Sequence, residues 1–196
     1  MQQSVFVQAG DALIIVDVQN DFLTGGSLAV PHGDEVLPVL NGYIALFRQA
    51  QLPIVATRDW HPPEHGSFQA QGGPWPPHCV AGSRGAGFAV LLELPCESII
   101  ISKATAADRD AYSGFEGTEL DALLRKAGVA RVFVGGLATD YCVLNTVRDA
   151  LRLGYATVLL TDAVRAVDVQ AGDGERAINE MLRGGAVAAT LTQIRR

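Results

Sequence analysis

Short apolar segments alternate along this chain with stretches that have helical spacing, and this alternation limits the folds available to it. Each apolar segment is rich in Val, Ile or Leu and lacks strict polar alternation, as expected of strands covered on both faces. These segments are residues 12–16, 53–57, 98–102, 131–135, 157–161 and 186–191. Helical spacing occurs at residues 34–51, 118–128, 139–154 and 174–183. The pattern predicts an α/β fold: a mostly parallel central sheet of about six strands with helices on both faces.

Length and charge narrow the class of protein. A chain of 196 residues suits one well-buried core, so we expect a single domain over residues 1–196. The net charge is −6 and no basic cluster occurs, which argues against nucleic acid as a partner. The longest apolar runs are strand-sized, far below the roughly 20 residues that a membrane-spanning helix needs. We therefore expect no membrane association.

The cysteines and the first ten residues indicate in which cellular compartment the protein is expected. Three cysteines cannot all pair, and their spacing suggests no disulfide framework: Cys79, Cys96 and Cys142. Residues 1–10 lack the basic start and continuous apolar stretch of a signal peptide. We expect a cytoplasmic protein, and the sequence leaves open whether it forms a homo-oligomer.

One long segment, residues 60–87, is rich in Pro, Gly, His and Trp and shows no periodicity. A loop of this length in a small domain is usually functional or disordered, and its tryptophans and histidines argue against disorder. Ligands of parallel sheets bind beyond the carboxyl ends of the strands. Four reactive side chains each follow a predicted strand at that end: Asp17, Asp59, Lys103 and Cys142. We expect them to meet at one edge of the sheet.

Cys142 is the candidate nucleophile. It falls in the predicted first turn of a helix, where free N–H groups and the helix dipole favour a thiolate. The alternative is a small buried core residue, the commonest fate of a free cysteine. Lys103 would lower the pKa of a nearby thiol, and Asp17 could take its proton as general base. Either charged residue alone could be structural, but together they predict a thiolate that attacks an amide carbonyl.

A metal site is the second candidate. Asp59 and His61 stand two residues apart after a strand, and His65 and His78 follow in the loop. Oxygen and imidazole ligands suit zinc, manganese or iron, and the absence of thiolate ligands argues against a closed structural zinc site. The alternative is a surface loop with incidental histidines. Cys79 follows His78, so in an extended segment it should face away from the metal.

Four motifs occur in order over almost the full length of the chain. They are DVQNDF at 17–22 with GGSL at 25–28, DWHP at 59–62 with WPPH at 75–78, Lys103 with YSGF at 112–115, and GLATDYC at 136–142. Together they resemble the nicotinamidase/pyrazinamidase family of the isochorismatase-like cysteine hydrolase superfamily. The resemblance implies the fold predicted above and a cysteine amidohydrolase that takes part in NAD salvage.

The resemblance also implies roles for individual residues. The catalytic residues would be Asp17, Lys103 and Cys142. A cis peptide between Leu137 and Ala138 would turn the N–H of Ala138 alongside that of Cys142 to form an oxyanion hole. Nicotinamide would be hydrolysed to nicotinate and ammonia through a thioester on the cysteine.

One divalent metal ion would hold the substrate ring. The resemblance assigns it to Asp59, His61 and His78, with zinc favoured over iron or manganese. His65 is left as a further ligand or a neighbour of the ligands, and His32, in a turn, is expected to be solvated. The pyridine ring would lie between aromatic side chains that otherwise belong to the core: Phe22, Trp75 and Tyr112. Two alternatives are a hydrolase of another small amide or carbamoyl amide, and a non-catalytic metal-binding protein on this fold.

Overall fold

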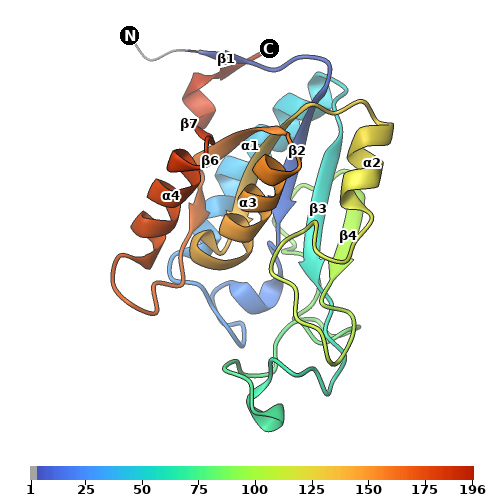
Figure 1. Ribbon diagram of the computed structural model, residues 1–196, viewed down its shortest axis with the longest axis vertical. Coiled ribbons are helices and arrows are strands. Elements are labelled where there is room, and N and C mark those ends of the chain that lie inside the picture. The colour runs from blue at the N-terminus through green and yellow to red at the C-terminus, as the bar shows by residue number, and fades with distance from the viewer. Residues whose placement is uncertain (1–3) are drawn as a thin grey trace.

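A six-stranded parallel sheet forms the centre of the computed structural model, which describes residues 4–196 (Figure 1). Its strand order is β4-β3-β2-β5-β6-β7. The strands are β2 (Asp11–Val16), β3 (Ile54–Asp59), β4 (Ile99–Lys103), β5 (Arg131–Leu137), β6 (Ala156–Arg165) and β7 (Val187–Ala189). Each expected strand is found and every pairing is parallel, which confirms the predicted sheet.

Helices cover both faces of this sheet (Figure 1). One face carries α1 (Val36–Gln49), and the other carries α2 (Leu120–Lys126), α3 (Leu144–Arg152) and α4 (Asp173–Arg183). Successive residues of β2 explain why no polar alternation is seen. Leu13 and Ile15 pack in the cluster that includes α1, whereas Ile14 and Val16 pack in the cluster of the other three helices. Both faces of the strand are therefore apolar.

Short elements complete the fold. A two-stranded parallel sheet joins β1 (Val5–Phe6) to β8 (Ile194–Arg195), and neither strand was predicted. Single helical turns are η1 (Asn20–Phe22), η2 (Gly33–Glu35), η3 (Gln69–Gln71) and η5 (Leu191–Gln193), and a π turn, η4 (Thr139–Val143), precedes α3. Gly128 and Gly154 follow their helices with φ of 70° and 88°, in the left-handed region expected of helix-ending glycines.

Some predicted boundaries were wrong. Strand β6 runs to Arg165 instead of ending at residue 161, and β7 is confined to three residues. The irregular segment after β3 continues to residue 98, beyond the predicted end at 87, and only η3 interrupts it. It projects past the carboxyl ends of the strands, at the bottom of Figure 1.

Strands β2 and β5 approach each other closely at Val16 and Gly136, which are paired across the sheet. Gly136 has φ of 123°, and a Cβ atom there would lie 2.1 Å from the carbonyl oxygen of Val16. Only glycine fits this position. The close approach brings the turn after β5, which carries Cys142, beside the end of β2, which carries Asp17.

Within residues 4–196, no helix is long and apolar enough to cross a membrane.

Candidate active site and metal centre

The four reactive side chains meet at the carboxyl edge of the sheet, as predicted. Asp17 follows β2, Asp59 ends β3, Lys103 ends β4, and Cys142 lies in η4 after β5. The parallel register pairs Asp59 directly with Lys103. All four residues are buried. Their proximity follows from the sheet, because neighbouring parallel strands end at the same edge.

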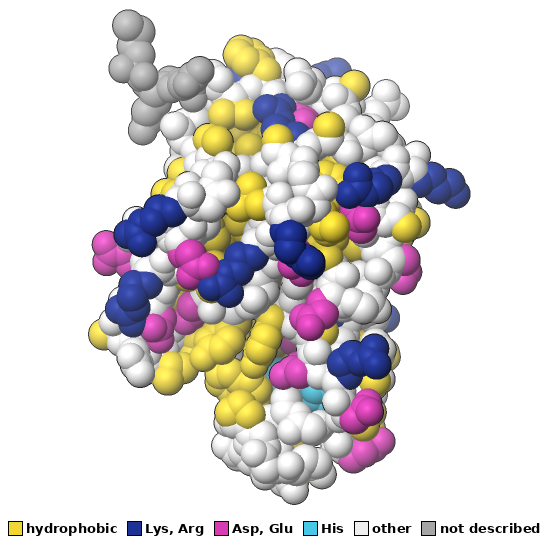
Figure 2. Space-filling model, viewed as in Figure 1, with side chains coloured by type: hydrophobic (Ala, Val, Ile, Leu, Met, Phe, Trp, Pro, Cys, Tyr) yellow, Lys and Arg dark blue, Asp and Glu magenta, His cyan; other side chains and the backbone are white. Residues whose placement is uncertain are grey.

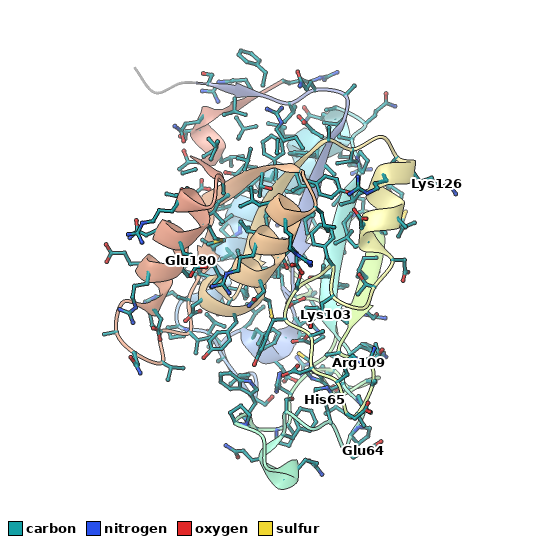
Figure 3. The ribbon with its side chains drawn as sticks, in the orientation of Figure 1. Glu64, His65, Lys103, Arg109, Lys126 and Glu180 are labelled. Atoms are coloured by element: carbon teal, nitrogen blue, oxygen red, sulfur yellow. The ribbon has the colours of Figure 1, made fainter. Side chains whose placement is uncertain are left out.

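Lys103 contacts the other three members of this cluster, and Figure 3 shows it at the sheet edge above the projecting loop. Its Nζ lies 3.0 Å from Asp17 Oδ2, 2.5 Å from Asp59 Oδ1 and 3.4 Å from Cys142 Sγ. It also donates to the carbonyl of Ala111 at 3.1 Å. Burial favours the neutral amine, but the two carboxylates outweigh it and hold the pKa of Lys103 well above its ordinary value. The ammonium is therefore charged.

Asp17 has one oxygen committed and one available. Its Oδ1 accepts a hydrogen bond of 2.6 Å from Thr57 Oγ1. Its Oδ2 contacts the Lys103 ammonium, yet no donor among residues 4–196 is aligned to make a hydrogen bond to it. Complete burial raises the pKa of Asp17, Lys103 opposes the shift, and Asp59 adds to it. A carboxylate with a raised pKa and an open oxygen is suited to accept a proton.

Cys142 differs from the sequence-based expectation in its charge state. Burial raises the pKa of its thiol well above the ordinary value; Lys103 lowers it in part, and Asp17 and Asp59 raise it further. The expectation that the cation and the helix would yield a thiolate is therefore wrong for the resting cluster. The thiol is protonated there, and a nucleophile forms only if a base removes the proton.

The peptide bond between Leu137 and Ala138 is cis, as the resemblance implied. Ala138 lies directly before η4 and lines the same cavity as Cys142. The two residues predicted to form an oxyanion hole therefore line one cavity.

Asp59, His61 and His78 form a second group at this edge. One ligand atom from each lies within 4.8 Å of the others. His61 Nδ1 lies 3.0 Å from the carbonyl oxygen of His78, and His78 Nδ1 lies 2.8 Å from that of Pro76. A carbonyl can only accept, so each Nδ1 is the donor and each Nε2 keeps a free lone pair. Two fixed imidazoles and a carboxylate are a donor set that fits a divalent transition metal.

Electrostatics also favour a cation in this group. Burial alone would raise the pKa of Asp59, but Lys103 and His61 hold it below its ordinary value, so the carboxylate is ionised. Burial lowers the pKa of His61, which favours the neutral imidazole that binds metals. Asp17, Asp59 and Cys142 also bring ligand atoms within 4.8 Å of one another. The Lys103 ammonium already lies against all three, so a metal ion is excluded there.

His65 is buried beside the metal group, with its ring centroid 4.3 Å from that of His61. Its Nε2 donates to the carbonyl of Arg109 at 3.2 Å, and its Nδ1 lies 2.7 Å from Ser67 Oγ. Figure 3 shows His65 and Arg109 together in the projecting loops. Both ring nitrogens are engaged, so in this arrangement His65 neighbours the ligands and supports the ring of His61. Its ligand atom also falls near Asp110, which is exposed.

The expected aromatic side chains line one cavity between the two groups. Phe22, Trp75 and Tyr112 surround it together with Asp59, His78, Ala138 and Cys142. Trp75 Nε1 donates to the hydroxyl of Tyr112 at 3.2 Å, which ties two of the walls together. Figure 2 shows hydrophobic side chains gathered where the body of the molecule meets the projecting loop.

Sequence reasoning missed four other residues of this cavity: Leu28, Val30, Tyr141 and Val167. Tyr141 packs edge-on against Trp75, with ring centroids 5.2 Å apart. A signal for Tyr141 existed, because it directly precedes Cys142 in the nucleophile motif. Val167 lies in the loop after β6, and no sequence pattern placed that loop at the cavity.

The remaining sequence expectations concern residues outside the site. The His32 side chain is 75% exposed, as predicted. Cys96 is exposed and Cys79 is buried; none of the three cysteines is in a disulfide. Cys79 belongs to the hydrophobic cluster that includes α1 and to none of the possible metal groups within residues 4–196, which agrees with the expectation that it faces away from the metal.

The parallel sheet and the thiol, carboxylate and ammonium groups at its carboxyl edge define an α/β protein built around a buried, cysteine-containing polar cluster. The family model described as the Isochorismatase domain matches residues 11–193. The chain belongs to the isochorismatase family. A nicotinamidase of Escherichia coli (strain K12) is 40% identical to it, over 92% of this chain and 94% of its own length.

Solved structures resemble the chain over most of its length. A pyrazinamidase of Pyrococcus horikoshii in complex with zinc is 50% identical, with a TM-score of 0.89 over 92% of this chain and 99% of its own. The PnC1 protein of L. infantum in complex with nicotinate is 39% identical, with a TM-score of 0.90 over 98% of both chains. The fold and the relative sizes of the chains therefore agree closely.

Proposed function

We propose that this protein is a nicotinamidase, an amidohydrolase that converts nicotinamide, and pyrazinamide-like amides, to the acid and ammonia. The observation that carries the proposal is one cavity with aromatic walls that holds Cys142 together with the metal-group residues Asp59 and His78. A ring amide bound there would have a nucleophile at one end and a metal group at the other. The relatives named nicotinamidase and the nicotinate-bound neighbour support this substrate class.

The first half of the reaction forms a thioester. Asp17 Oδ2 removes the Cys142 proton, and the charge of the adjacent Lys103 stabilises the thiolate. The sulfur attacks the carboxamide carbon, and the N–H groups of Ala138 and Cys142 stabilise the oxyanion. The C–N bond then breaks as Asp17 gives the proton to the leaving nitrogen, which departs as ammonia.

The second half regenerates the enzyme. Asp17 takes a proton from a water molecule, whose oxygen attacks the thioester carbon. The C–S bond breaks, the acid leaves, and Asp17 returns the proton to the sulfur. Lys103 stays charged in both halves because its carboxylate neighbours keep its pKa high. Its role is electrostatic, and Asp17 carries the protons.

The metal group would bind the ring end of the substrate. Asp59, His61 and His78 would hold one divalent ion, which when bound supplies a Lewis acid for the pyridine nitrogen. Phe22, Trp75 and Tyr112 enclose the ring faces. Zinc is the ion we favour, supported by the zinc-bound neighbour. A cytoplasmic location and a single domain over the whole chain belong to the same proposal.

The test is ammonia release from a panel of small amides, with the metal content of each preparation measured in parallel. Nicotinamide and pyrazinamide should be turned over well above benzamide and aliphatic amides. A preparation that prefers a carbamoyl amide, or that turns over none of the panel while loaded with metal, would contradict the proposal.

A further inference from the structure

The side chain of Gln19 makes two hydrogen bonds to the backbone of Asp59. Gln19 Nε2 donates to the carbonyl of Asp59 at 2.8 Å, and Gln19 Oε1 accepts from the N–H of Asp59 at 2.8 Å. Gln19 Nε2 also donates its second hydrogen to the carbonyl of Ala86 at 2.9 Å. Gln19 is fully buried, and all of its polar atoms have partners. Because both backbone groups of Asp59 are held, the point from which its side chain extends is fixed, and Lys103 Nζ holds the carboxylate itself.

Asp21 holds the peptide bond that joins His78 to Cys79. Asp21 Oδ2 accepts from the N–H of Cys79 at 2.7 Å. On the other side of that peptide, the carbonyl oxygen of His78 accepts from the ring of His61 at 3.0 Å. Cys79 has φ of 47°, a conformation that costs free energy for a residue with a Cβ. The hydrogen bond from Cys79 to Asp21 helps to hold it.

We propose that Gln19 and Asp21 are positioning residues that hold Asp59 and His78 ready for the metal ion. The inference rests on the proposed metal site and adds two residues that do not touch the ion. Both come from the segment after β2 that begins with the proposed general base, Asp17. One short segment therefore contributes to the thiol chemistry and also sets the geometry of the metal group. Partners of metal ligands that fix ligand orientation typically change metal affinity about 10- to 100-fold when removed.

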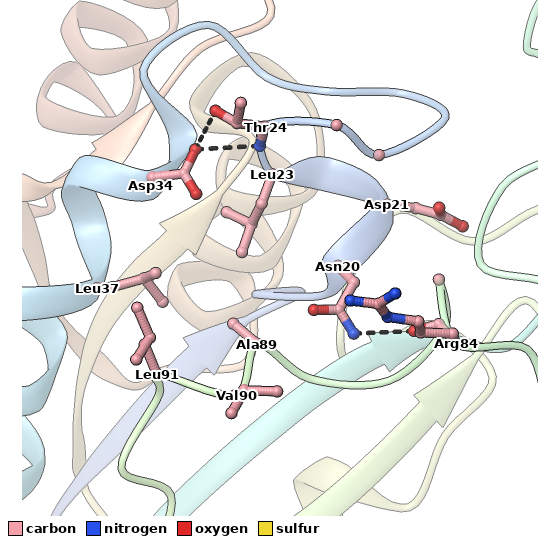
Figure 4. Close-up of a pocket in the computed structure, with 13 residues that line it drawn as sticks. Asn20, Asp21, Leu23, Thr24, Asp34, Leu37, Arg84, Ala89, Val90 and Leu91 are labelled. Carbon is pink, nitrogen blue, oxygen red and sulfur yellow. Dashed lines mark hydrogen bonds between the residues drawn. The ribbon is translucent and has the colours of Figure 1, made fainter.

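Asn20, between them, provides a matched control. It donates to the carbonyl of Arg84 at 2.8 Å and faces a different cavity, which Leu23, Leu37 and Leu91 also line (Figure 4). Asn20 thus anchors the same projecting loop as Gln19 does, but it touches neither Asp59 nor the peptide after His78. If anchoring of the loop alone mattered, loss of the Asn20 side chain would weaken metal binding as much as loss of the Gln19 or Asp21 side chain.

The experiment is a titration of the metal-free protein with Co²⁺, followed by the visible absorption of the bound ion, which reports both affinity and ligand geometry. The variants are Gln19→Met, Asp21→Ala, Asp21→Asn and the control Asn20→Ala, with Asp59→Ala to locate the site. Circular dichroism and thermal unfolding of the metal-free forms report on folding. Asp21 is only half-buried, so its variants test the inference even if Gln19→Met does not fold.

We expect Gln19→Met and Asp21→Ala to bind Co²⁺ about 10- to 100-fold more weakly and with an altered spectrum. Asn20→Ala should match wild type. Asp21→Asn keeps an acceptor oxygen for the N–H of Cys79 and should restore most of the affinity. Folded Gln19→Met and Asp21→Ala proteins with wild-type affinity and spectrum would overturn the positioning role and leave the metal site standing. Cobalt binding that Asp59→Ala does not weaken would overturn the proposed metal site, and this inference with it.

Discussion

The Lys103 ammonium lies 3.4 Å from the sulfur of Cys142, and it is the main influence that lowers the pKa of this buried thiol. Asp17 acts in the opposite direction, because its negative charge favours the protonated thiol. The two residues are themselves an ion pair. Substitution of Lys103 should therefore raise the pKa of the Cys142 thiol, and substitution of Asp17 should lower it.

We predict that Lys103→Met moves alkylation of Cys142 to higher pH, whereas Asp17→Asn moves it to lower pH. The first variant loses the charge that favours the thiolate, and the second loses a charge that opposes it. Turnover should fall in both, by about 10²–10⁴ where an acid/base group is lost. The measurement is the iodoacetamide rate against pH in a Cys96→Ala background, since Cys96 is the exposed thiol. Shifts in the same direction would refute the electrostatic assignment.

Cys142→Ala should abolish ammonia release and leave the fold intact, because no other side chain can form the thioester. Cys96→Ala is the matched control: its side chain is exposed and lies in a loop, so its activity should equal that of wild type. Ammonia assays with circular dichroism separate loss of chemistry from loss of fold. Appreciable activity in Cys142→Ala would remove the cysteine from the mechanism.

The pH dependence of activity should report Asp17. Only the ionised carboxylate can accept the thiol proton, so kcat/KM should fall as the pH drops through the pKa of Asp17. Burial raises that pKa above 3.8, which places the acidic limb above the range of an ordinary aspartate. Thr57 donates to the ionised carboxylate and lowers its pKa, so Thr57→Val should move the limb to still higher pH.

The control for this shift is Thr157→Val. Thr157 is a buried strand residue whose hydroxyl donates to the carbonyl of Tyr155, away from the site. Its pH profile should match wild type. If Thr57→Val also leaves the profile in place, another group sets the acidic limb.

Loss of the metal should discriminate between substrates. Nicotinamide carries a ring nitrogen, whereas benzamide has the same shape without it, and a site built around a polar contact rejects the analogue that leaves it unpaired. His61→Ala, or chelation, should weaken nicotinamide hydrolysis far more than benzamide hydrolysis. The ratio of kcat/KM for the two amides, with and without metal, is the measurement. An unchanged ratio in folded metal-free protein would make the metal structural and favour the alternative small-amide hydrolase.

Gly136→Ala should destabilise the fold by more than about 4 kcal/mol, because the new Cβ would collide with the Val16 carbonyl. Gly154→Ala separates collision from backbone strain: Gly154 also has positive φ, but no atom lies within 4 Å of the added Cβ. That control should lose only about 1–2 kcal/mol. Urea denaturation measures both. Equal losses would mean that strands β2 and β5 can separate at little cost.

The sequence predicted the strands of the central sheet well, but it predicted strand ends and short strands less well. The six strands were predictable because fully buried strands are continuous apolar runs. The extension of β6 was not, because residues 162–165 include Asp162 and Arg165, and pairing with β5 resumes at Val164 only after a register shift between Val134 and Gly136. Strands β1 and β8 have two residues each, too few for any periodicity.

The site was predicted in part for a similar reason. Strand ends located the reactive residues, and the resemblance proposed their roles, which remain predictions. The protonated state of Cys142 was missed because burial depends on packing from the whole chain. Gln19 and Asp21 stood within a quoted motif, but the backbone groups that they hold lie 40 and 58 residues away in sequence. No local pattern reports a partner at that distance.

The register that pairs Asp59 with Lys103 makes one carboxylate common to both halves of the site. In the resting site Asp17 and Asp59 are ionised and Lys103 is protonated, so this buried region has one net negative charge, which disfavours a bound anion. A divalent ion on Asp59 reverses the sign of that net charge. We therefore expect metal-loaded protein to bind anionic analogues of the tetrahedral intermediate, and nicotinate itself, more tightly than metal-free protein does. The ion would thus act on the far end of the substrate through the field of the site as well as through the ring.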